Sequence, residues 1–267
     1  MFLDAFFAAG RNEPEKKNSS DQARLNALRR DHRPYALKRI DLAFQKWYAG
    51  YFLGPHFERL GHGCTFMKPW HVEVFGSAVS LGDYATVIAT PDRKVRLTVW
   101  SELERGGRIA IGEYALICPG VRISAATEIT VGDSCMLAQG VYVTDADWHG
   151  VYDRSLAIGN SAPVVIEDNV WIGDSAIVCK GVHIGKNSII GAGSVVVKDI
   201  PDNAIAGGNP ASVLRYLEEG RTFRTRADWL ADPEALAGQF ETIDRHLMRE
   251  NSWSGWIRSL VRPRKLD

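Results

Sequence analysis

Aliphatic residues recur at every sixth position in the second half of the chain. From Ile166 onward, six residues carry this period: Ile166, Ile172, Val178, Ile184, Ile190 and Val196. The residue that follows each of them is Glu, Gly or Cys, and only Val197 departs from this rule. A helix repeats about every 3.6 residues and a strand every two, so neither explains the period. We interpret each hexad as a short strand plus a turn, with three hexads forming one triangular coil of a parallel β-helix.

The same period is present earlier in the chain and is interrupted once by a long insertion. Its earlier positions are Leu81, Val87, Ile111, Ile117, Ile123, Val131, Leu137 and Val143. We therefore predict a mainly β fold with the β-helix over residues 72–208. Between Val143 and Ile166 the chain advances 23 residues instead of six. The excess must leave the coils as a loop, residues 144–163, and loops projected from rigid scaffolds are where functional residues concentrate.

The segments on either side of the repeat are predicted to be helical. Residues 1–71 form the N-terminal segment, where Ser19–Asp21 can cap a helix over Gln22–Arg30 and Pro34 can begin another over Tyr35–Leu53. Residues 209–267 form the C-terminal segment, with a short helix expected at Arg215–Glu219 and an amphipathic helix at Asp228–Asn251.

Charge and cysteine content narrow the possible classes of protein. The chain has 32 basic and 32 acidic residues among 267, so its net charge does not favour nucleic acid. The four cysteines lack metal-site spacing and are predicted to be small buried residues in a reducing cytoplasm, with no metal bound. The apolar start of the chain lacks a basic region and contains Asp4, which argues against a signal peptide.

Three motifs of the repeat region resemble a known family. They are Asn169–Gly173 (Asn-Val-Trp-Ile-Gly), Ile190–Pro201, and the closing Gly208–Ala211 (Gly-Asn-Pro-Ala). In this order and spacing they resemble the hexapeptide-repeat acetyltransferases, in particular the maltose/galactoside and polysaccharide O-acetyltransferases, over residues 105–216. The resemblance implies a left-handed parallel β-helix and a homotrimer. It also implies acetyl-CoA as the acyl donor, bound between neighbouring prisms, and a carbohydrate acceptor.

The resemblance assigns the catalytic base to a histidine of the projecting loop, and the loop contains only His149. A histidine can remove the proton of a hydroxyl group, whose own pKa lies far above neutral. Asp145 and Asp147 are expected to orient the imidazole, although aspartate is also common in turns. Trp148 is a candidate to stack on a sugar ring. Two roles remain open for Asp153 and Arg154, which are contact with the acceptor sugar or a surface ion pair.

The resemblance also places donor contacts on the later coils. Trp171 is expected to pack near the pantetheine arm, with Ala192 offering backbone groups to it. Lys198 and Arg215 are expected to face the phosphates of coenzyme A, the alternative being ordinary surface charges. The maltose branch often carries an asparagine before the loop, but Ile117–Gly120 contains none, so a different acceptor is expected.

Several functions remain open at this point. The first is O-acetylation of a surface polysaccharide or its precursor; the alternatives are N-acylation of a nucleotide-linked amino sugar and a non-catalytic β-helix module. Two segments rich in aromatic and basic residues, Phe44–Phe52 and Trp253–Arg264, suggest peripheral contact with the inner membrane surface. The competing interpretation is that they cap the open end of the solenoid.

Overall fold

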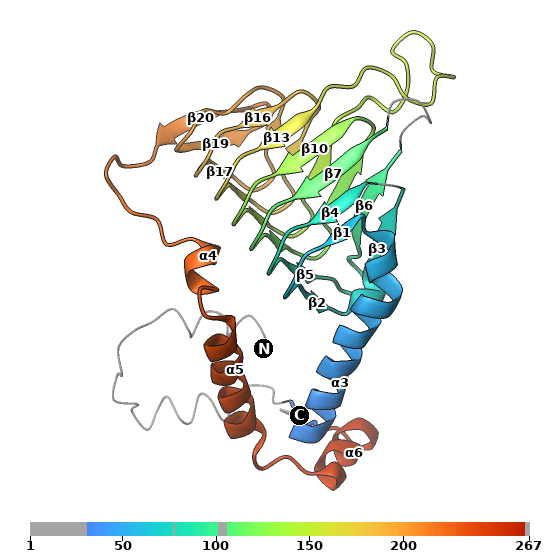
Figure 1. The fold of residues 1–267 in the computed structure, drawn as a ribbon, viewed down its shortest axis with the longest axis vertical. Helices are drawn as coiled ribbons and strands as arrows, with labels where there is room; N and C mark the ends of the chain where they lie inside the picture. Colours follow the sequence, from blue (N-terminus) through green and yellow to red (C-terminus); the bar gives the residue numbers. More distant parts are fainter. Residues whose placement is uncertain (1–30, 77, 101–105, 265–267) are drawn as a thin grey trace. The chain divides into compact units, whose positions relative to one another are not determined.

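A computed structural model describes residues 31–76, 78–100 and 106–264 of the chain. Its centre is a β-helix in which consecutive strands lie in turn on sheets A, B and C, the three sides of a prism (Figure 1). Sheet A contains β1 (Arg59–Leu60), β4 (Val79–Leu81), β7 (Arg108–Ile111), β10 (Glu128–Val131), β13 (Val164–Ile166) and β16 (His183–Ile184). Sheet B contains β2 (Thr65–Met67), β5 (Thr86–Ile88), β8 (Leu116–Ile117), β11 (Met136–Leu137), β14 (Trp171–Ile172), β17 (Ile189–Ile190), β19 (Ala204–Gly208) and β20 (Ala211–Tyr216). Sheet C contains β3 (Val72–Phe75), β6 (Val95–Val99), β9 (Arg122–Ala125), β12 (Tyr142–Thr144), β15 (Ile177–Val178) and β18 (Val195–Val196).

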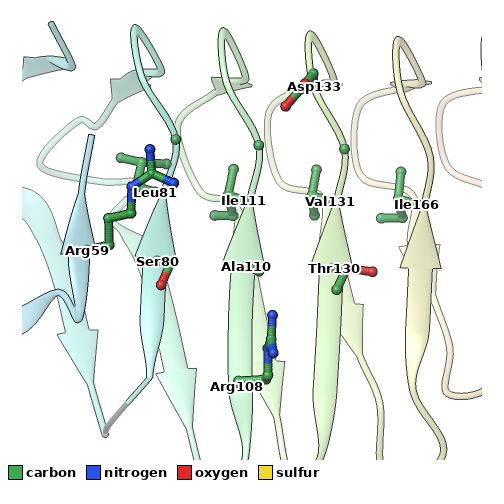
Figure 2. Close-up of a pocket in the computed structure, with 13 residues that line it drawn as sticks. Arg59, Ser80, Leu81, Arg108, Ala110, Ile111, Thr130, Val131, Asp133 and Ile166 are labelled. Carbon is green, nitrogen blue, oxygen red and sulfur yellow. The ribbon is translucent and has the colours of Figure 1, made fainter. Parts of the chain in front are cut away.

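The hexad residues stack in register from coil to coil. On sheet A, Leu81 pairs with Ile111, Ile111 with Val131 and Val131 with Ile166, and Figure 2 shows these side chains in one column. All four are at most 3% exposed. Burial of each such side chain stabilises the fold by about 2 kcal/mol relative to exposure. The predicted left-handed parallel β-helix fold class, with helical segments beside it, is thereby confirmed.

The last coil is closed by a strand where we predicted a helix. β20 runs antiparallel to β19, with Arg215 opposite Ile205, so the predicted helix at Arg215–Glu219 is wrong. The physical reason is that β19 would otherwise present an unpaired edge, and pairing with β20 satisfies its backbone groups. At the other end, strands begin at Arg59, before residue 72 where we expected them.

Most of the helices precede or follow the strands in the sequence. Their bounds are α3 (Tyr35–Tyr48), η1 (a π-helix, Ala49–Leu53), η2 (Gly54–His56), η3 (Pro69–His71), α4 (Arg226–Trp229), α5 (Pro233–Met248) and α6 (Trp253–Val261). The predicted helix at Gln22–Arg30 lies outside the described residues. None of the described helices has the length and apolar character needed to cross a membrane.

Contacts divide the chain into two compact units. The larger is Ile40–Gln239 and contains the β-helix; the smaller joins the two ends of the chain, described here as residues 31–39 and 240–264. Within the smaller unit, Lys38 pairs with Asp244 at 2.5 Å and the hydroxyl of Tyr35 donates to Glu241 at 2.8 Å. The three-part division into residues 1–71, 72–208 and 209–267 stays a prediction.

Within the larger unit, the chain after β20 returns to the prism through Arg226. This residue is 7% exposed, and its guanidinium donates to the carbonyl oxygen of Tyr114 at 2.6 Å and to Thr86 Oγ1 at 3.1 Å. Burial lowers the pKa of Arg226 to about 10, which still leaves it cationic at neutral pH. The segment that leads to α4 is therefore anchored on the corner between sheets A and B.

Candidate active site

The projecting loop leaves the prism at one corner. It connects β12 of sheet C to β13 of sheet A, so it emerges where these two sheets meet (Figure 1). The coil below turns this corner at residues 125–127, and the coil above turns it at 179–182. The insertion predicted from the repeat is confirmed. The turns of the adjacent coils at the same corner surround the base of the loop.

The base of the loop, which we call the neck, consists of residues 145–147 and 159–162. Its two strands are joined by an antiparallel bridge between Ala146 and Ser161. Two hydrogen bonds flank the bridge, from the N–H of Asp147 to the carbonyl of Asn160 at 2.8 Å and from the N–H of Ala162 to the carbonyl of Asp145 at 2.9 Å. The loop is thus a pinched excursion with paired strands, and His149 follows directly after one of them.

Asp145 ties the neck to the coil below. Its side chain is fully buried at 0% exposure. One carboxylate oxygen accepts from the N–H of Ala126 at 2.7 Å, and the other accepts from the N–H and the hydroxyl of Thr127 at 2.7 and 2.9 Å. A buried carboxylate with three donors is satisfied, and its negative charge strengthens each bond.

Asp147 ties the neck to the coil above. Its Oδ1 lies 2.6 Å from the Nζ atom of Lys180, which belongs to the turn at residues 179–182. Both side chains are about one third exposed, so this ion pair contributes at most ~1 kcal/mol to stability. Neither aspartate bonds to the ring of His149 within the described part of the chain, because both carboxylates are used in holding the neck.

Besides its contacts with the coils below and above, the neck is held by Trp148, which packs on strand β12. Its indole N–H donates to the hydroxyl of Tyr142 at 3.2 Å and to Thr144 Oγ1 at 3.1 Å. Tyr142 is itself covered by the guanidinium of Arg122, 4.3 Å from the ring centroid. These contacts use the polar edge of Trp148 inside the chain, and they stiffen the segment that leads into His149.

His149 itself is exposed beyond the neck. A Cβ atom on Gly159 would collide with the carbonyl oxygen of His149, so the close approach of the two loop strands requires glycine there. Asp153, farther along the loop, is exposed and accepts from the N–H and the hydroxyl of Ser155, at 3.0 and 2.5 Å. Those bonds hold the pKa of Asp153 below its usual value. Arg154 is also exposed.

The predicted donor-binding residues lie on other parts of the prism. Trp171 is 47% exposed on the outer face of sheet B, between Met136 and Ile189 of the adjacent strands. Arg215 is exposed on β20 of the same sheet. Sheet B is the side opposite the corner that carries the loop, so one chain does not bring these two side chains to His149.

The remaining two donor-binding candidates occupy corners of the last coils. Lys198 is exposed in the turn after β18, which stacks above the turn that contains Lys180. Ala192 is exposed in the turn between β17 and β18, at the corner between sheets B and C. The structure therefore groups Lys198 with the loop corner and separates Ala192 from it.

A shallow hollow lies on the outer face of sheet A, away from the residues predicted from the sequence. Figure 2 shows its small outward side chains, Ser80, Ala110 and Thr130, with Arg59 and Arg108 beside them. It contains no residue of the loop. The residues that line this hollow include one carboxylate, that of Asp133, and no histidine.

The four cysteines are distributed over the three corners of the prism, and only Cys179 lies at the corner that carries the loop. Burial raises the pKa of Cys135 to about 12 and that of Cys64 to about 11, so both thiols stay protonated at neutral pH. The pKa values of Cys118 and Cys179 are also raised by burial. No group of three or more His, Cys, Asp or Glu side chains in the described ranges is arranged to hold a metal ion.

Sequence reasoning missed Lys180 and Thr127, which hold the neck from above and below. The signal was available in the repeat, because Val143 and Val178 share one hexad phase and pair across coils. The turns that follow them must therefore stack, which places Lys180 against the start of the loop.

Comparison with known proteins agrees with the fold and the repeat. Residues 163–198 match the family described as bacterial transferase hexapeptide (six repeats). A galactoside O-acetyltransferase of Lactococcus lactis is 32% identical over 165 residues, which is 61% of this chain and 65% of that protein. The galactoside O-acetyltransferase of Escherichia coli is 41% identical over 93 residues, 34% of this chain and 45% of that protein.

Among solved structures, a hexapeptide-repeat acetyltransferase of Vibrio cholerae aligns over 69% of this chain and 93% of its own, with 25% identity and a TM-score of 0.41. The family match over residues 163–198 and the two galactoside O-acetyltransferases confirm the resemblance noted in the sequence. The chain spans less than two thirds of the length of both galactoside O-acetyltransferases.

Proposed function

We propose that the protein is an acetyl-CoA-dependent O-acetyltransferase that acts on a carbohydrate hydroxyl of a surface polysaccharide or its precursor. The proposal depends mainly on the way the neck of the loop holds His149 outside the prism. The loop at residues 144–163 leaves the regular prism, and it is held on three sides so that it presents a histidine. The names of the galactoside O-acetyltransferases support an acetyl donor and a sugar acceptor.

The proposed reaction is direct transfer. The imidazole of His149 takes the proton of the acceptor hydroxyl while the oxygen attacks the thioester carbonyl carbon. An O–C bond forms, the C–S bond breaks, and the protonated imidazole returns its proton to the departing thiolate of coenzyme A. Asp145 and Asp147 act as positioning residues that hold the neck, a revision of the role first expected for them.

The activity is tested by release of free thiol from acetyl-CoA in the presence of a panel of sugars and oligosaccharides. We expect acceptor-dependent thiol release, and a product heavier by one acetyl group that is removed by mild alkali because it is an ester. An alkali-stable product would indicate N-acylation of an amino sugar instead. No thiol release with any acceptor would leave the non-catalytic module as the better interpretation.

We further propose a homotrimer in which the loop of one copy meets sheet B of its neighbour. The support is the separation just described, because His149 stands at one corner while Trp171 and Arg215 lie on the opposite side. Cyclic assembly brings a corner of each prism to a face of the next. Lys198 and Arg215 would then bind the phosphates of the donor, and Trp171 would pack on its pantetheine arm.

A mixing experiment tests this arrangement. Chains carrying His149→Ala and chains carrying Trp171→Ala with Arg215→Ala are each expected to be inactive. Co-expressed in equal amounts, they should recover roughly a quarter of the original activity, because one quarter of random neighbouring pairs would join an intact loop to an intact face. Lack of recovery in trimers that contain both chains would place the whole site within one copy.

The location we propose is the cytoplasm, where acetyl-CoA would be available and the four free cysteines would stay reduced. We also propose that the segments Phe44–Phe52 and Trp253–Arg264 contact the inner surface of the membrane.

A further inference from the structure

Helix α3 and the π-helix η1 expose aromatic side chains and bury a polar one. The buried positions are Gln45, Ala49 and Leu53, four residues apart along one face. We call the exposed aromatic set the aromatic patch; its members and exposed fractions are Phe44 (46%), Trp47 (52%), Tyr51 (65%), Phe52 (45%) and Trp70 (38%). A segment that buries Ala49 and Leu53 but leaves four large aromatic rings exposed is not explained by packing on the prism alone.

The aromatic patch is a preformed surface. Trp47 stacks on Tyr51 with the ring planes 13° apart, and Phe44 touches both Trp47 and Trp70 at centroid distances of 5.6 and 5.9 Å. Phe52 meets Trp47 edge to face. Because these rings already contact one another, a partner that covers them would not have to order them first.

The charges around the aromatic patch favour an anionic partner. Lys46 and Lys68 flank the rings. Of the acidic residues nearby in the sequence, Asp41 accepts from the side chain of Gln45 at 3.1 Å, and Glu73 pairs with Lys94 and Arg96 at 2.6 and 2.7 Å. Lys46 and Lys68 are both exposed, and the backbone N–H of Lys68 donates to Gln45 at 2.7 Å, which fixes it beside α3. Residues 41–73 contain three acidic and three basic residues, so the attraction depends on the placement of the two exposed lysines beside the rings and not on an excess of charge.

We propose that the aromatic patch docks the protein on the surface of a membrane that contains anionic phospholipids. Tryptophan and tyrosine prefer the boundary between headgroups and acyl chains, because their rings are apolar and their N–H and O–H groups stay hydrated. Lysines beside them add attraction to anionic headgroups. A second copy of the chain would supply no excess negative charge to match Lys46 and Lys68.

Helix α6, in the smaller unit, has the same composition and gives separate support. Trp253, Ile257 and Leu260 are 52–65% exposed and lie on one helical face. Residues 251–264 contain three arginines and no acidic residue. An amphipathic helix with large apolar side chains and flanking arginines is typical of elements that lie in the membrane interface.

Vesicle flotation of the full chain tests the proposal. We expect binding to phosphatidylcholine vesicles that contain about 30% phosphatidylglycerol, and much weaker binding to phosphatidylcholine alone or at high salt. The triple variant Phe44→Ser, Trp47→Ser, Tyr51→Ser should lower the partition coefficient at least about tenfold, because it removes most of the apolar area that enters the interface. Lys46→Gln with Lys68→Gln should lower it roughly fivefold for each lysine, on the anionic vesicles only.

The matched control is Phe75→Ser with Trp100→Ser. These rings are 53% and 50% exposed and contact each other at 4.7 Å, but they lie on β3 and just after β6, outside the aromatic patch. Control and triple variant should both keep thiol release from acetyl-CoA, which shows that they fold and separates this proposal from the proposed activity.

Two results would overturn the proposal. One is equal vesicle binding by the triple variant and the unmodified chain. The other is no vesicle binding by the unmodified chain. In that case, a drop in molecular mass caused by the triple variant would identify a second copy as the occupant of the patch, and vesicle binding gained on deletion of residues 1–30 would identify the chain's own start.

Discussion

Replacement of His149 by alanine is expected to lower kcat/KM for acetyl transfer at least about a hundredfold, because the acceptor hydroxyl loses its general base. The neck contacts of Asp145, Asp147 and Trp148 do not involve the imidazole, so the loop should keep its structure. We therefore expect the loss in kcat, with an unchanged KM for acetyl-CoA. The measurement is steady-state thiol release with the best acceptor found in the panel.

His183→Ala is the matched control for that experiment. His183 is also exposed, but it lies on sheet A and its Nε2 contacts a carboxylate oxygen of Glu167 at 2.8 Å. Its removal should change kcat less than about twofold, as for a surface substitution away from the site. Equal activity of His149→Ala and the unmodified enzyme would reject the assignment of the base.

Asp145→Ala is expected to have the largest effect on stability among the loop substitutions. It leaves the buried N–H of Ala126 and the partly buried N–H of Thr127 without their acceptor, and hydrogen bonds to a charged group contribute about 1.5–3 kcal/mol each. We expect the free energy of unfolding to fall by about 3 kcal/mol, measured as a lower urea midpoint. Activity at low temperature should fall as well, because the neck loses its attachment to the coil below.

Lys180→Met provides the control at the same neck. Its ion pair with Asp147 is partly exposed, so the stability loss should stay below ~1 kcal/mol. An Asp145→Ala variant with an unchanged urea midpoint and a large loss of kcat would contradict the positioning role. Such a result would support the first expectation, that Asp145 contacts the imidazole of His149 directly.

The fold could be predicted from the sequence because a β-helix is nearly one-dimensional. Each hexad contacts mainly the hexads one coil away, so the spacing of Ile166, Ile172 and Val178 already implies which residues stack. The advance of 23 residues between Val143 and Ile166 likewise implied a loop. The strand β20 was not predictable in this way, because the segment Arg215–Glu219 pairs with a strand edge that exists only once the last coil has formed.

The sequence identified the residues of the candidate site, but it did not predict which groups two of them contact. His149 could be identified as the loop histidine, but the two aspartates beside it were assigned to the imidazole because they are near it in sequence. In the structure, Asp145 bonds to the coil below and Asp147 to the coil above, although residues two apart in a strand ordinarily share one face. Proximity along the chain therefore did not predict the partners of Asp145 and Asp147.

By itself the sequence determined the six-residue repeat, the stacking order of the coils, the position of the one long loop and the presence of His149 on it. Only the tertiary structure decided that Asp145 and Asp147 hold the neck, that Trp171 and Arg215 lie on the side opposite the loop, and that α3 turns its rings outward. The physical reason is that periodicity reports which residues are buried in the repeat. The direction of a polar or aromatic side chain at a corner depends on neighbours from other coils, and these meet only in the folded chain.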